Sequence, residues 1–66
     1  MGNNKVIERN YISGRYVWLE KDNDKYVVLY EGKDFKRIIY DATDNEIDAK
    51  KLFVNACIMV LKEGEK

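Results

Sequence analysis

Short runs of alternating apolar and polar residues fill the first part of the chain and predict β-strands. Each run is rich in β-branched and aromatic residues, which favour extended backbone. The runs are KVIERNYI (5–12), RYVWLEK (15–21), KYVVLYE (25–31) and FKRIIYD (35–41). The connections SG, DND and GKD are short, as in antiparallel hairpins. We therefore expect a four-stranded antiparallel β-meander.

A helix is predicted after the strands, from about residue 44 to residue 63. The segment TDNE places Thr43 as the N-cap and Glu46 three residues later, which is the spacing of a capping box. Gly64 follows the apolar run LFVNACIMVL, at a position where a left-handed C-cap favours glycine. The expected fold class is α+β, with the order ββββα in one small domain over 1–66. Its expected parts are a frayed N-terminus (1–4), a sheet (5–41) and a C-terminal helix (43–63).

The expected helix carries two apolar stripes, because each helical residue advances about 100° around the axis. One stripe mixes large and small residues, as is typical of a side that packs on a sheet: Ala49, Leu52, Phe53, Ala56 and Val60. The second stripe lies on the other side and consists of Ile47, Val54, Ile58 and Leu61. A narrow polar strip of Asp48, Asn55 and Lys62 remains.

One sheet can cover only one side of one helix, so the second stripe needs another partner. Its residues recur at spacings of seven, four and three, as in a helix–helix seam. We expect this stripe to be the interface of a homo-oligomer, with a dimer as the expected order. Two alternatives are a strongly curled sheet that covers both sides of the helix, and the docking of a different protein.

The faces of the sheet depend on the strand registers, because side chains alternate between the two faces. With a three-residue DND loop and two-residue SG and GK turns, the helix would cover Val17, Leu19, Val27, Leu29, Ile38 and Tyr40. The opposite face would gather rings and arginines: Arg9, Tyr11, Tyr16, Trp18, Tyr26, Tyr30 and Arg37, with Phe35 and Ile39. A slip of one residue would reverse a whole strand.

Aromatic rings beside arginines are typical of two kinds of binding surface, and cross-strand packing also favours them. They stack on nucleic-acid bases, and they form the hot spots of protein interfaces. The chain has 12 basic and 12 acidic residues, and this neutrality disfavours long nucleic acids, whose binding depends on phosphate neutralisation. We therefore expect a protein partner ahead of a nucleic acid or nucleotide, whose phosphates Arg9, Arg15 and Arg37 would hold.

Catalytic and metal-binding sets are missing from the sequence. Histidine is absent, and the single cysteine, Cys57, lies in an apolar run, so we expect an inert buried thiol. The DND segment lacks the glycine and glutamate of a calcium loop and is expected to be a turn. We expect no enzymatic activity, no cofactor and no metal.

The start of the chain, MGNNKVIERN, has no apolar signal region, and the run at 52–61 is too short to span a bilayer. We therefore expect a cytoplasmic protein that does not associate with membranes.

The expected ββββα order resembles the single-strand-binding fold of the PC4 coactivator type, whose members dimerise and bind strands over their sheet. This resemblance is one of topology and assigns no residues. Our leading hypothesis is a small, non-enzymatic, homo-oligomeric binding protein that occupies a macromolecular partner as a regulator or inhibitor. Its size suits a protein encoded by bacteria or their phages. The alternative is single-stranded nucleic-acid or nucleotide binding through the aromatic sheet face.

Overall fold

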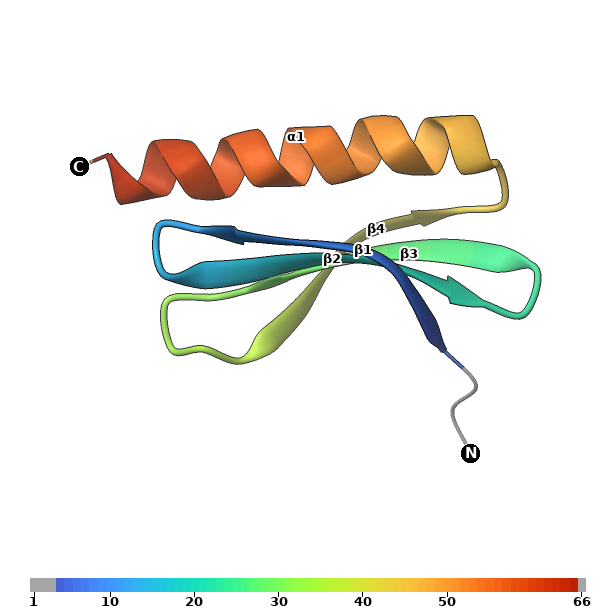
Figure 1. The fold of residues 1–66 in the computed structure, drawn as a ribbon, viewed down its shortest axis with the longest axis horizontal. Helices are drawn as coiled ribbons and strands as arrows, with labels where there is room; N and C mark the ends of the chain where they lie inside the picture. The colour runs from blue at the N-terminus through green and yellow to red at the C-terminus, as the bar shows by residue number, and fades with distance from the viewer. Residues whose placement is uncertain (1–3, 66) are drawn as a thin grey trace.

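The computed structural model describes residues 4–65 and confirms the α+β class and the ββββα order. The elements are β1 (Lys5–Ile12), β2 (Arg15–Asp22), β3 (Lys25–Glu31), β4 (Arg37–Thr43) and α1 (Glu46–Gly64). The strands form one antiparallel sheet in the order β1-β2-β3-β4. Figure 1 shows α1 running along one side of the sheet, while no described element covers the opposite side. We call this opposite side the open face.

Part of the segment expected to be frayed, residues 1–3, lies outside the described residues. Asn4 is described, and its side-chain amide donates a hydrogen bond to the Glu20 carboxylate at 3.1 Å. The chain is therefore connected to the sheet from its first described residue.

The first hairpin has the predicted two-residue turn, since Ile12 pairs with Arg15. Ser13 and Gly14 both have positive φ, at 53° and 82°, as a turn matching the sheet twist requires. The register places Arg9 opposite Trp18 and Tyr11 opposite Tyr16, as expected.

The second hairpin differs from the prediction and changes which side chains face the helix. Asp22 pairs with Lys25, so the loop contains two residues instead of three. Asn23 accommodates the turn at a φ of 56°, a conformation that asparagine adopts more readily than most residues. This one-residue difference reverses β3, so that Tyr26, Val28 and Tyr30 face the helix, whereas Val27 and Leu29 lie on the open face.

The third connection is longer than the expected two-residue GK turn. Glu31 pairs with Arg37, and the loop closes through a hydrogen bond from the Gly32 N–H to the Lys36 carbonyl. Phe35 lies in this loop with a φ of 64° and is exposed, so the prediction that the strand begins at residue 35 is wrong. A register shift between Val28 and Leu29 follows.

The pairing of Glu31 with Arg37 determines the orientation of the first residues of β4. Ile39 pairs with Leu29 and lies on the open face, whereas Ile38 pairs with Tyr30 on the helix side. Tyr40 packs against the core and makes an edge contact with the Tyr30 ring. The expected faces of Ile38, Ile39 and Tyr40 are therefore confirmed, although the turn that was expected to produce them is not present. The prediction that the helix covers Ile38 is wrong, because this side chain is 40% exposed and lies outside the core.

The core lies between the sheet and the first stripe of α1. The sheet contributes Val17, Leu19 and Val28, and the helix contributes Ala49, Phe53, Ala56 and Val60, all buried. Burying a large aliphatic side chain contributes about 1.5–3 kcal/mol, so this small set supplies much of the stabilisation. The prediction of the core-facing stripe is confirmed, with Leu52 partly buried beside it.

Both ends of α1 differ from the predicted caps. Asn45 is the N-cap, and its side chain accepts a hydrogen bond from the Asp48 N–H at 3.0 Å. Thr43 ends β4 instead, and its hydroxyl accepts from the Asn45 N–H, so the predicted capping box does not form. At the other end Gly64 is helical and Glu65 is the C-cap with a φ of −83°, so the left-handed cap is also wrong.

An ion pair fastens the C-terminal end of α1 to the sheet. The Arg15 guanidinium donates to the Glu63 carboxylate at 2.5 Å and to the Glu31 carbonyl at 3.0 Å. Arg15 is only 7% exposed, so its guanidinium group lies beneath the helix and is paired there with Glu63. Its expected contribution to a phosphate site is therefore not supported by its position.

Close contact between α1 and the first turn explains the helical glycine. A Cβ added at Gly64 would lie 2.5 Å from the Ser13 Cβ, which is too close for real carbon atoms. Alanine in a helix interior is normally favoured over glycine by about 1 kcal/mol. The contact with Ser13 is expected to outweigh that preference.

We expect Gly64→Ala to lower the free energy of unfolding by about 1 kcal/mol, because the added methyl group overpacks the contact with Ser13. Chemical denaturation followed by circular dichroism measures this change. The matched control is Ser13→Gly combined with Gly64→Ala, which removes the colliding side chain and should recover the lost stability. A single Gly64→Ala variant that is more stable than the wild type would contradict the packing argument.

Candidate binding surfaces

The second stripe of α1 is exposed along its whole length. Relative exposures are 69% for Ile47, 54% for Val54, 44% for Ile58 and 46% for Leu61. The sheet therefore does not curl around both sides of the helix, and that alternative is wrong. Four large aliphatic side chains remain in water unless another molecule covers them.

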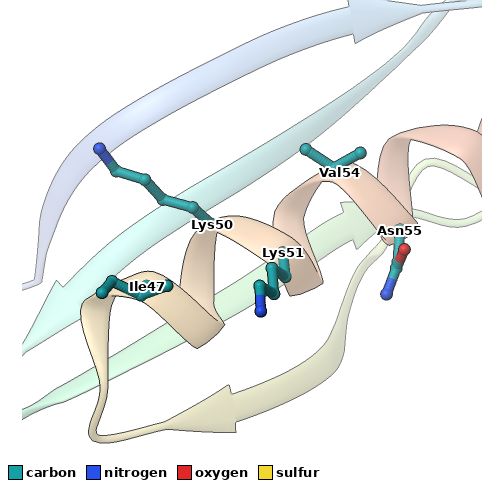
Figure 2. Close-up of a pocket in the computed structure, with 5 residues that line it drawn as sticks. All are labelled: Ile47, Lys50, Lys51, Val54 and Asn55. Carbon is teal, nitrogen blue, oxygen red and sulfur yellow. The ribbon is translucent and has the colours of Figure 1, made fainter.

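The surface of α1 has two shallow hollows along this stripe. Figure 2 shows one hollow, lined by Ile47, Lys50, Lys51, Val54 and Asn55. A second hollow is lined by Val54, Cys57, Ile58 and Leu61 of the helix, together with Asn10 and Ile12 of β1. The stripe thus offers concave positions as well as exposed apolar side chains.

The polar strip beside the stripe is exposed too, as expected. Asp48, Asn55 and Lys62 all lie on the solvent-facing part of α1. In Figure 2 the Asn55 side chain points away from the side on which Lys50 and Val54 project. The strip therefore forms one margin of the apolar surface.

The open face of the sheet carries a continuous row of rings and guanidinium groups. Tyr11 and Tyr16 are 4.8 Å apart between ring centroids, and Tyr16 stacks on Trp18 at 6.0 Å. The Arg9 guanidinium lies 5.0 Å from the Tyr16 ring centroid, and that of Arg37 lies 4.5 Å from Trp18. Five of the predicted site residues are thus brought together as an Arg–aromatic row, the name used below for Arg9, Tyr11, Tyr16, Trp18 and Arg37.

Three predicted site residues do not belong to this row. Tyr26 and Tyr30 face the helix because of the two-residue turn in the second hairpin, and both pack against the core. Arg15 pairs with Glu63 below the end of α1. The open face is consequently less basic and has fewer tyrosines than expected.

A buried carboxylate lies next to the Arg–aromatic row and pairs with Arg37. The sequence interpretation missed this residue, Glu20. Glu20 is only 4% exposed although it lies on the open face, and Arg37 donates to it at 2.5 Å. Asn4 donates to its other oxygen. Glu20 lies two residues after Trp18, so strand alternation alone places it on the same face and could have revealed it.

An aliphatic area adjoins the Arg–aromatic row on the open face. Leu29 and Ile39 lie in the same cross-strand line as Arg9 and Trp18, and Ile39 is 65% exposed. The face therefore combines an Arg–aromatic side over β1 and β2 with an aliphatic side over β3 and β4. Its net charge is small, because Glu20 balances Arg37.

Residues 4–65 contain no cluster of three or more side chains that could hold a metal ion. Cys57 is half-buried against the core rather than fully buried, and its sulfur accepts a hydrogen bond from the Asn10 amide at 3.5 Å. Over the same residues, no helix combines the length and apolar character needed to cross a membrane.

Comparison of the chain with protein-family models, curated proteins and solved structures finds no match. The resemblance to the PC4 coactivator type thus remains one of element order.

The contact between Arg37, Trp18 and Glu20 can be tested directly. We expect Arg37→Ala to lower the free energy of unfolding by about 1–2 kcal/mol, because buried Glu20 loses a charged hydrogen-bond donor. The Trp18 ring should also become more accessible to acrylamide quenching. The control is Lys36→Ala, which removes an exposed neighbouring cation and should change neither measurement. Unchanged quenching in Arg37→Ala would show that the guanidinium does not cover the ring in solution.

Proposed function

We propose that this protein is a small, non-enzymatic binding protein that assembles with itself through the exposed stripe of α1. It would act as a regulator or inhibitor by occupying a macromolecular partner with its open face. The observation that carries the proposal is the exposure of Ile47, Val54, Ile58 and Leu61 on a helix whose other side already fills the core. Fully burying one such side chain is favourable by about 1.5–3 kcal/mol, so covering the stripe would give a large driving force for association.

The composition of the open face supports a protein partner. Tyrosine, tryptophan and arginine are the residues that most often dominate protein interfaces. Mutual stacking already orders the Arg–aromatic row, so binding would cost little side-chain entropy. The aliphatic side, with half-buried Leu29 and exposed Ile39, extends the same surface.

The charge distribution is less favourable to the alternative, a single-stranded nucleic acid or nucleotide. Arg15 is buried on the other side of the sheet, and Arg37 is paired with Glu20. Affinity for nucleic acid rises with the number of phosphates neutralised by cationic side chains. Arg9 and Arg37 also occupy positions over the Tyr16 and Trp18 rings, where bases would otherwise stack.

Assembly through α1 predicts that Ile58→Asp yields a folded protein of monomeric mass, whereas the wild type has the mass of an oligomer. A carboxylate within the interface would have to lose its water without a partner. Light scattering coupled to gel filtration measures the mass, and circular dichroism confirms the fold.

The matched control is Ile39→Asp, the same substitution at an exposed isoleucine on the open face. It should leave the oligomeric mass unchanged. A monomeric wild type would overturn self-association, and a monomeric Ile39→Asp would move the interface to the open face.

Binding through the open face predicts that Arg9→Ala with Tyr11→Ala abolishes capture of the protein partner by the immobilised protein. Both side chains are exposed members of the Arg–aromatic row, so their removal should leave the core intact. Lys33→Ala, at an exposed position in the loop between β3 and β4, is the control and should capture the partner as the wild type does. Equal capture by all three proteins would show that the partner binds elsewhere.

The same surface can be tested for nucleic acid through Trp18, the only tryptophan. Single-stranded oligonucleotides and mononucleotides at low salt should leave its emission unchanged. Quenching that weakens with added salt would instead favour the nucleic-acid alternative.

A further inference from the structure

The exposed stripe of α1 has the spacing of a coiled-coil seam. Ile47, Val54 and Leu61 are separated by seven residues, and Ile58 follows Val54 by four. Lys51 holds the position equivalent to Ile58 one heptad earlier. Such a repeat keeps one line of side chains facing a neighbouring helix.

The two hollows along the stripe have the form of holes that receive side chains from such a helix. Each is shallow, and its lining includes four helical residues at positions i, i+3, i+4 and i+7, the set that forms a hole in knobs-into-holes packing. The first hole is formed by Ile47, Lys50, Lys51 and Val54, and Figure 2 shows these side chains around it. The second hole is formed by Val54, Cys57, Ile58 and Leu61, with Asn10 and Ile12 of β1 along one edge. The lysine stems in the first hole can cover apolar surface while their charges remain in water.

The charges of the polar strip at the margin of the stripe match those of a second, antiparallel copy of the same strip. Asp48, Asn55 and Lys62 are also separated by seven residues, with the acid and the base at equal distances from the amide. All three side chains are exposed. An antiparallel copy turned about Asn55 would bring each Asp48 beside a Lys62 on the same margin of the seam. A parallel copy related by a two-fold axis would place the two strips on opposite margins, where they could not pair.

We infer that a second copy of this chain occupies the stripe, with the two α1 helices antiparallel and the two-fold axis close to Asn55. This inference rests on the proposed self-association and specifies its geometry. Leu61 of each protomer enters the hole bounded by Ile47 and Val54 of the other, and Val54 enters the hole bounded by Val54 and Leu61. Two Asp48–Lys62 ion pairs and an Asn55–Asn55 contact form beside these apolar layers.

Single-cysteine variants in a Cys57→Ser background test this register with a short bis-maleimide cross-linker. Asn55→Cys should cross-link to itself, because both copies lie at the axis. Asp48→Cys alone and Lys62→Cys alone should not, since copies related by this axis lie roughly 21 Å apart at about 1.5 Å per residue. A mixture of Asp48→Cys and Lys62→Cys proteins should cross-link to each other.

The outcomes separate the register from the assembly itself. Self-linking of Asp48→Cys would contradict the separation that this antiparallel register requires, and would overturn the inference while leaving self-association intact. A dimeric mass with no cross-link in any variant would place the interface on another surface. A monomeric mass for the wild type would overturn the proposed assembly as well, and the stripe would then belong to a different protein.

Charge exchange provides a second test that does not depend on cysteine chemistry. Asp48→Lys and Lys62→Asp should each weaken dimerisation by about tenfold, because two attractive pairs become repulsive. The double variant should return to within about twofold of the wild type, since the pairs are restored with reversed sign. Dissociation constants come from the concentration dependence of the mass, after circular dichroism has confirmed folding. A double variant as weak as the single ones would overturn the pairing.

Discussion

A helix packed on a single sheet can bury only the side chains that face that sheet, and this constraint governs the whole molecule. The buried side of α1 is narrow and includes two alanines, Ala49 and Ala56, which allow the helix to approach the strands closely. Phe53 and Val60 then supply most of the helical contribution to the core. A domain of this size has little apolar surface to spare, since short chains bury a smaller fraction of their surface than long ones. Four aliphatic residues on the exposed side of α1 therefore point to an interaction outside the chain.

Two ion pairs connect the elements of the fold, and they also determine which charges are available for binding. Arg15 and Glu63 join the end of α1 to the sheet, while Arg37 and Glu20 join β4 to β2 across the open face. Each pair brings a largely buried group together with a more exposed one. Removing the more exposed partner, Glu63 or Arg37, would leave the buried charge of Arg15 or Glu20 without its ion pair, which is costly. Arginines that appear in the sequence to be ready for phosphates are thus largely engaged within the fold.

The element order could be predicted from the sequence because strand propensity, alternation and helical periodicity all agree. The side-chain orientation of β3 could not, because it depends on whether the DND segment turns with two residues or three. Asp22 is compatible with either a strand or a loop, and only the backbone of Asn23 decides between them. That single choice moved Tyr26 and Tyr30 from the open face to the core. The N-cap was missed for a similar reason, since both Thr43 and Asn45 are good capping residues and β4 extends through Thr43.

The two candidate surfaces lie on opposite sides of the molecule, and this arrangement has a consequence for binding. The exposed stripe points away from the sheet, and the open face lies on the side of the sheet that α1 does not cover (Figure 1). Pairing of two helices through the stripe would leave both open faces uncovered and directed outward. A dimer of this kind could engage two sites at once, and such bivalency can strengthen binding by about a hundredfold or more when the spacing of the sites permits it. Self-association would then raise the apparent affinity of the open face without adding any contact to it, which suits a small protein whose single copy offers little binding surface.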